Sequence, residues 1–192
     1  MNQPDHKAER LIFFSDAVFA IAITLLVIEI EVPTLGTAHG SGWHAMRELL
    51  PSFAGFAISF LVIGRFWMGH HAALAQLSVF SPRLLWPNLF LLMAIAFMPF
   101  ATAFLSRNFG EIFPTAFYNA TLLVTALLSW NLIRVVGSIQ TARDAEMGRS
   151  SLSVAVAATL AFGLSFVAPA FSQLGLLAIP LIGRLQRWRQ TV

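Results

Sequence analysis

The chain has 192 residues, of which 57% are hydrophobic and 11% are charged, and its mean hydropathy is +0.75. A soluble domain carries roughly 25% charged residues, and a single domain of this size cannot bury so much apolar surface. The composition excludes an ordinary soluble enzyme and a disordered protein. The lack of cysteine excludes a disulfide-stapled secreted domain. We expect an all-α integral membrane protein in which residues 1–192 form one domain.

Six apolar stretches are long enough to be membrane spans, when each is compared with the roughly 20 residues that a helix needs to cross a bilayer. Lipid offers no partners for backbone amides, so these spans are expected to be helices. They cover approximately residues 11–32, 49–68, 84–105, 114–136, 152–171 and 174–185. The sixth is short because Arg184 ends its apolar run. A polar stretch rich in Gly and His, Thr34 to Arg47, joins the first two spans.

The basic residues predict the orientation of the spans. If the N-terminus is cytoplasmic, ten of the 12 Lys and Arg residues lie on the cytoplasmic side and two lie outside, which agrees with the positive-inside rule. The inner ones are Lys7, Arg10, Arg65, Arg83, Arg134, Arg143, Arg149, Arg184, Arg187 and Arg189; the outer ones are Arg47 and Arg107. We therefore expect a multi-pass protein with both termini in the cytoplasm. The basic isoelectric point reflects this topology, and no nucleic-acid partner is expected.

The first span has a narrow apolar face. On a helical wheel with Ile21 as the origin, the side chains of this face fall within about 40° of it, and the Thr24 hydroxyl lies about 60° away. The apolar members are Phe14, Ala17, Ile21, Leu25, Ile28 and Val32. Ser15 and Asp16 point away from this face. The stripe has two interpretations: a helix–helix contact, or the lining of a pore built from several copies of the helix, where an apolar constriction gates by dewetting.

Two carboxylates, Glu29 and Glu31, follow near the outer end of this span and flank the stripe at about 80° on either side. A ring of carboxylates concentrates cations at a pore mouth. Solvation at the membrane interface explains the same two residues equally well.

Asp16 lies inside the membrane boundary, where an ionisable side chain needs a partner. The topology brings the end of the second span and the start of the third to the same depth. We expect a polar network of Ser15, Asp16, His71, Trp86 and Asn88, with Arg10 or Arg65 nearby. Its simplest role is to brace the first helix. The alternative is a proton relay, because histidine titrates near neutral pH.

Motifs for catalysis and resident metals are absent from the sequence. It has no Ser/His/Asp set, no phosphate-binding glycine loop and no pair of catalytic carboxylates. His70 and His71 are adjacent, so their side chains diverge on a helix, and neither has an i, i+4 partner for a metal site. We therefore expect no enzyme activity, no cofactor and no metal other than a transient ion.

The segment Arg10-x-x-x-Phe14-Ser15-Asp16, followed by an apolar run that ends at Pro33, resembles the signature of the transmembrane protein 175 family. Trp67-x-x-x-His71, Trp86-x-Asn88-Leu and Pro99-Phe100 extend the similarity over about the first 105 residues. The family comprises lysosomal potassium channels and their bacterial homologues. A single six-span unit is similar to the bacterial form, which implies the plasma membrane of a bacterium.

The resemblance implies a homotetramer whose first helices line a central pore for K⁺. By position after the Phe-Ser-Asp motif, the constriction falls at Ile21, further pore layers fall at Leu25 and Ile28, and Thr24 matches a hydroxyl linked to potassium preference. The expected function is passive K⁺ flux with modest preference over Na⁺, in contact with membrane lipid. The alternative function is a proton-coupled transporter that uses Asp16 and His71.

Overall fold

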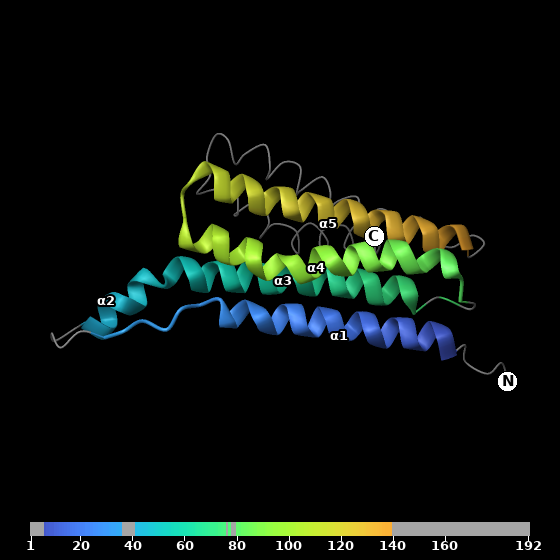
Figure 1. Cartoon of the computed structure of the whole chain (residues 1–192), viewed down its shortest axis with the longest axis horizontal. Helices are drawn as coiled ribbons and strands as arrows, with labels where there is room; N and C mark the ends of the chain where they lie inside the picture. The colour runs from blue at the N-terminus through green and yellow to red at the C-terminus, as the bar shows by residue number, and fades with distance from the viewer. Residues whose placement is uncertain (1–5, 36–40, 76, 78–79, 140–192) are drawn as a thin grey trace, which may run out of the picture.

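The computed structural model of the chain describes residues 6–35, 41–75, 77 and 80–139. All the regular elements in these residues are helices (Figure 1). They are α1 (His6–Ile28), α2 (Ser41–Glu48), α3 (Leu50–Leu74), the 3₁₀ turn η1 (Pro82–Leu84), α4 (Leu85–Arg107) and α5 (Ile112–Ile139). Four segments are long and apolar enough to cross a membrane: α1, α3, η1 together with α4, and α5.

The four long helices run side by side, and their arrangement places α1 at an edge (Figure 1). Helix α4 packs against α1, α3 and α5, so it is the centre of the described bundle. Helix α1 contacts α3 and α4 but, among the described elements, does not reach α5. One side of α1 is therefore buried, and the other side lacks a neighbour within this part of the chain.

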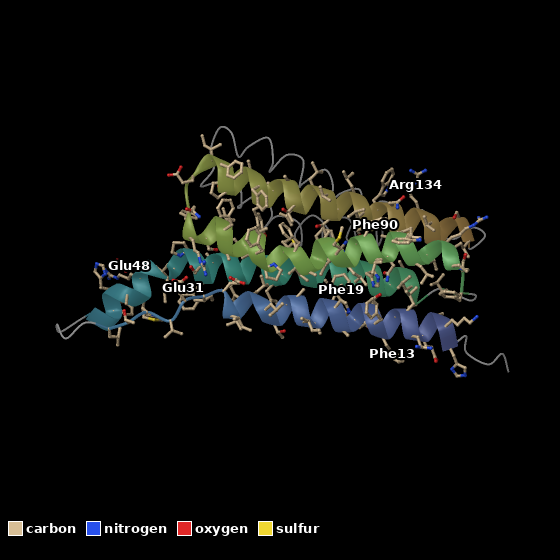
Figure 2. All side chains as sticks on the ribbon, viewed as in Figure 1. Phe13, Phe19, Glu31, Glu48, Phe90 and Arg134 are labelled. Atoms are coloured by element: carbon tan, nitrogen blue, oxygen red, sulfur yellow. The ribbon has the colours of Figure 1, made fainter. Side chains whose placement is uncertain are left out.

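The periodicity of α1 determines which side is buried. Its buried residues recur every three or four positions, the spacing of one helix face; they are Ala8, Leu11, Ser15, Phe19, Ala22 and Leu26. Phe19 is 1% exposed and points into the bundle, whereas Phe13 is 70% exposed and points away from it (Figure 2). These positions are apolar apart from Ser15, so this is the face that α1 packs against its neighbours.

A cluster of hydroxyl groups links the other three long helices. Thr102 of α4 donates a hydrogen bond to Ser59 Oγ of α3 at 2.8 Å, and Ser59 Oγ lies 2.9 Å from the Tyr118 hydroxyl of α5. All three residues are buried. Buried hydroxyls that find one another in an apolar core avoid the cost of an unsatisfied polar group. This cluster connects the centre of the bundle without involving α1.

The turn between α4 and α5 has a clear local cause. Asn108 donates from its side chain to the Phe104 carbonyl at 2.9 Å and so satisfies the last turn of α4. Gly110 follows with φ of 92°, a conformation that side chains with a Cβ rarely adopt. Thr115 then bonds back to the Glu111 carbonyl through its hydroxyl. The chain thereby reverses direction within a few residues, which makes α4 and α5 antiparallel neighbours.

Each of the four predicted spans that fall in the described residues coincides with a long apolar helix, with shifted ends. The largest difference is at the end of the second span, which was expected near residue 68, whereas α3 continues to Leu74. The first span was expected to continue to Val32 but ends at Ile28. The Ile30 amide bonds to the Val27 carbonyl at 3.2 Å, which tightens the last turn. Pro33 has no amide hydrogen and disfavours a helical Val32 before it. Val32, Glu29 and Glu31 therefore do not occupy the helical-wheel positions predicted for them.

Helix α2 lies within the stretch that was read as a polar connection. Two i, i+4 pairs support it: the Arg47 guanidinium lies 5.4 Å above the Trp43 ring, and His44 lies 3.3 Å from Glu48. Such pairs are visible in the sequence, but the two glycines in and before the segment concealed the helix. The predicted spans 152–171 and 174–185 lie outside the described residues.

Candidate functional site: the exposed face of α1 and its buried anchor

The exposed face of α1 contains every residue that the sequence assigned to the constriction. Ile21 is 58% exposed, Leu25 is 39% exposed and Ile28 is 72% exposed, and Thr24 is exposed between them. Phe14 and Arg10 extend the same face toward the N-terminus of α1. The described helices therefore leave this face uncovered.

The Thr24 side chain has a defined hydrogen-bonding state. Its hydroxyl lies 3.0 Å from the Ala20 carbonyl and 2.9 Å from the Ile21 carbonyl, both in the preceding turn of α1. A hydroxyl that donates its hydrogen to the backbone still has oxygen lone pairs that accept. Thr24 therefore presents an acceptor oxygen on the exposed face, between two apolar layers, and an acceptor is the polarity that a cation needs.

A buried polar chain lies behind this face and joins three helices. His70 of α3 donates from Nε2 to Asn88 Oδ1 of α4 at 2.7 Å, and Asn88 donates from Nδ2 to Ser15 Oγ of α1 at 3.0 Å. Ser15 in turn donates to the Leu11 carbonyl at 2.8 Å. His70 and Asn88 are each 1% exposed, and Ser15 is fully buried. The three hydrogen bonds attach α1 to α3 and α4 in one rotational position, while the buried Nδ1 atom of His70 has no hydrogen-bond partner among the described residues.

A second polar contact lies next to this chain and nearer the surface. The Trp67 indole of α3 donates from Nε1 to Asp16 Oδ1 at 2.9 Å. The His71 ring lies against the same indole, with centroids 5.5 Å apart. The carboxylate in the first span therefore has a partner, as its position in the membrane required. Two adjacent residues of α1 are therefore held by different helices: Ser15 by Asn88 of α4, and Asp16 by Trp67 of α3.

Two members of the predicted polar network are corrected by these contacts. The histidine that bonds to Asn88 is His70, while His71 is exposed and only packs on Trp67. Trp86 is 67% exposed and its ring lies against Phe90, so the indole that binds Asp16 is that of Trp67.

The reason for both corrections is helical geometry. Consecutive residues differ by about 100° around a helix, and the buried positions of α3 lead to His70; they are Ser59, Val62, Ile63, Phe66, His70, Ala73 and Leu74. Trp86 is two residues before Asn88 and so points to nearly the opposite side of α4. Continuing the periodicity of α3 along the sequence would have identified His70 in advance.

The two carboxylates after α1 have a partner in the same chain. Arg107, the last residue of α4, places Nη2 3.0 Å from Glu31 Oε1 and 3.8 Å from Glu29 Oε2. All three side chains are partly or largely exposed. The sequence placed Arg107 on the same side as these carboxylates but did not indicate the pairing, because the contact joins segments about 76 residues apart. Among the described residues, no group of three or more His, Cys, Asp or Glu side chains is placed to hold a metal ion.

Comparison with known proteins identifies the family. Residues 10–99 match the family described as the endosomal/lysosomal potassium channel TMEM175. A protein named as a potassium channel from Streptomyces collinus is 36% identical over 156 residues, which cover 76% of this chain and 74% of that protein. The chain belongs to the TMEM175 family.

Two further relatives of the TMEM175 family agree with this assignment. A protein from a Chryseobacterium species, also named as a potassium channel, is 35% identical over 118 residues, 62% of this chain and 59% of that protein. A crystal structure described as a lysosomal potassium-selective channel TMEM175 homologue from Chamaesiphon minutus superposes with a TM-score of 0.78 at 27% identity, covering 94% of this chain and 97% of that one. These relatives are named as channels, which confirms a family without enzyme activity.

Proposed function

We propose that this protein is a potassium-permeable cation channel in which four copies of α1 surround a central pore. The exposed faces of α1 line the pore, with Ile21 as the constriction and Thr24, Leu25 and Ile28 as further layers. The chain crosses the plasma membrane of a bacterium six times, with the last two spans in residues 152–185 and with both termini in the cytoplasm. K⁺ passes without a catalytic step.

The observation that carries the proposal is the position of α1 at the edge of the bundle with its stripe uncovered. A helix at the centre of a protomer has no free face for a symmetry axis, whereas an edge helix does. The stripe also contains a hydroxyl whose acceptor lone pairs remain available between apolar layers. Lipid chains cannot use such a hydroxyl oxygen, whereas a permeating cation can be stabilised by it.

The charge pattern supports the orientation. The antiparallel helices place Lys7, Arg10, Arg83 and Arg134 at the end of the bundle that contains the start of α1, and Arg47 and Arg107 at the other end (Figure 1). An excess of basic residues marks the cytoplasmic side of a multi-pass protein. The N-terminal end of α1 is therefore assigned to the cytoplasm.

The proposed selectivity follows from partial dehydration. An isoleucine ring has no oxygen to coordinate a cation, so an ion that enters a narrow apolar constriction loses water without full replacement. K⁺ is larger than Na⁺ and holds its water less strongly, so the same ring opposes Na⁺ more. Thr24 oxygens lower the barrier one turn away from the constriction. The expected result is a modest preference for K⁺, and the same ring closes the pore when it is dry.

The buried chain Ser15–Asn88–His70 has a supporting role in this proposal. A constriction made of side chains keeps its width only if each copy of α1 holds its rotation. Adjacent residues on a helix differ by about 100°, so a rotation of that size would replace Ile21 at the axis with a neighbouring residue. The hydrogen bond that Asn88 donates to Ser15 holds that rotation from a face of the helix about 120° away from Ile21.

The test is K⁺ flux from liposomes that contain the purified protein. Ile21→Asn is expected to wet the constriction, raise the flux about tenfold or more, and lower the preference for K⁺ over Na⁺. The matched control is Val27→Asn, because Val27 is 53% exposed on the same helix but lies about 120° from Ile21. The control is expected to leave flux and preference unchanged. Equal behaviour of the two variants would reject Ile21 as the constriction.

The alternative of proton-coupled transport through Asp16 and His71 requires a path for the proton between them. The residue between them is Trp67, whose indole donates to Asp16 and has no acceptor site to pass a proton on. This contact favours a structural role for Asp16. Flux that saturates with a substrate and is abolished by His71→Gln, in protein that still assembles, would favour the transporter instead.

A further inference from the structure

We propose that Arg107 sets the negative charge at the pore mouth formed by the C-terminal ends of α1, and thereby limits the local concentration of cations there. The inference rests on the proposed function, because it needs copies of α1 to surround a pore. It concerns a residue outside the first span, at the end of the central helix α4.

The contacts give Arg107 its role. Its Nη2 atom bonds to Glu31 at 3.0 Å and lies 3.8 Å from Glu29, so one guanidinium faces two carboxylates. The pair of carboxylates and the guanidinium together carry one net negative charge, half of what the carboxylates carry alone. Glu29 directly follows Ile28, the last residue of α1. The two carboxylates that Arg107 contacts therefore lie one and three residues beyond the end of the exposed stripe.

The exposure of these groups determines what the contact does. The Arg107 side chain is 52% exposed and the Glu31 side chain is 75% exposed. Ion pairs this exposed add little to stability. Their charges still act on mobile ions in the surrounding water, and this effect weakens as the Debye length falls from about 30 Å at 0.01 M salt to about 3 Å at 1 M. The role of Arg107 is therefore electrostatic and depends on ionic strength.

Other basic groups near this end do not duplicate the contact. Arg47 lies on α2, where its guanidinium stacks over Trp43 at 5.4 Å. Glu48, also on α2, is paired with His44 at 3.3 Å. Arg47 has the same charge and lies at the same end of the bundle as Arg107, but no ion pair joins it to Glu29 or Glu31 among the described residues. It is the matched control.

The experiment measures K⁺ flux from liposomes containing the full chain at about 0.01 M and about 1 M salt. Arg107→Gln is expected to raise the flux about threefold at low salt, since the mouth then attracts more cations, and to leave it unchanged at high salt. Arg107→Lys, which keeps the charge, is expected to behave like the unmodified protein. Arg47→Gln is expected to change the flux much less than Arg107→Gln at low salt, and to leave it unchanged at high salt.

Each other outcome has a defined meaning. Unchanged flux for Arg107→Gln at low salt overturns the inference. An increase in flux that persists at about 1 M salt also overturns it, because an effect that salt does not screen indicates a loosened structure. If Arg107→Gln does not assemble, Glu31→Gln provides a second test, because it removes a negative charge from the same contact. It is expected to lower the flux at low salt only. If the flux at low salt does not fall, the inference is overturned. If the unmodified protein conducts no K⁺, the proposed function fails, whereas conduction without these salt effects rejects only the role of Arg107.

Discussion

The two ends of α1 are held in physically different ways. Near its N-terminal end, Ser15 joins Asn88 and His70 in a hydrogen-bonded chain that is closed to solvent. Beyond its C-terminal end, Glu29 and Glu31 meet Arg107 in exposed ion pairs. Buried hydrogen bonds are costly to break, because a group left without a partner keeps its desolvation penalty. Exposed ion pairs are weak and respond to salt.

Along this single helix, the contacts that stabilise the fold are therefore separate from the contacts that adjust the local charge. The buried end determines the rotation and position of α1, while the exposed end adjusts charge without much effect on folding. The difference follows from burial alone, since both ends use ordinary polar side chains. Substitutions at the two ends are therefore expected to affect different measurements, and the following predictions are ordered from the largest effect on stability to the smallest.

Asn88→Leu is expected to lower the free energy of unfolding by about 2–3 kcal/mol, because it leaves His70 Nε2 without its acceptor and removes the donor to Ser15. The measurement is thermal unfolding of the purified protein in detergent at low and high salt, and the loss is expected at both. Trp86→Leu is the control on the same helix, where exposure predicts a change near zero. A larger loss for Trp86→Leu would contradict the buried anchor.

His70→Leu and His71→Leu compare adjacent residues of α3. His70 is 1% exposed, bonds to Asn88 and packs 5.3 Å from the Phe19 ring, so its loss is expected to cost about 1–2 kcal/mol. His71 is exposed and packs only on Trp67, so its loss is expected to cost less than about 0.5 kcal/mol. The same thermal assay separates the two variants. A larger loss of stability for His71→Leu than for His70→Leu would support the network predicted from the sequence, which contained His71.

Glu31→Gln is expected to change the free energy of unfolding by less than about 0.5 kcal/mol, because its ion pair with Arg107 is exposed. Glu48→Gln is the control, since Glu48 forms a similarly exposed pair with His44. Both melting temperatures are expected to match that of the unmodified protein at high salt. A loss as large as that of Asn88→Leu would mean that the exposed end also determines the fold.

The sequence was sufficient for the features that depend on local pattern. Apolar length predicted the spans now seen as α1, α3, α4 and α5, and the wheel of the first span placed Ile21, Thr24, Leu25 and Ile28 on one face, which the structure leaves exposed. The Arg-x-x-x-Phe-Ser-Asp motif identified the TMEM175 family, and the comparisons confirm it. The role of these residues in a pore stays a prediction.

The features that were missed depend on how helices meet. Depth in the membrane places His70 and His71 at nearly the same level, so depth did not distinguish them; the rotation of α3 against α1 and α4 did. The ends of helices were also uncertain, since α1 stops at Ile28 and α2 interrupts a stretch read as polar connection. End positions depend on capping and on distant partners such as Arg107, which composition does not reveal.

The amino-acid sequence by itself determined that this chain enters a membrane and which face of its first span is apolar, because hydropathy and the 3.6-residue period are local properties. Only the tertiary structure decided which face of α1 is covered, which histidine reaches Asn88 and which cation meets Glu29 and Glu31. Those outcomes depend on the rotation and closeness of packed helices, which arise from contacts between segments far apart in the chain.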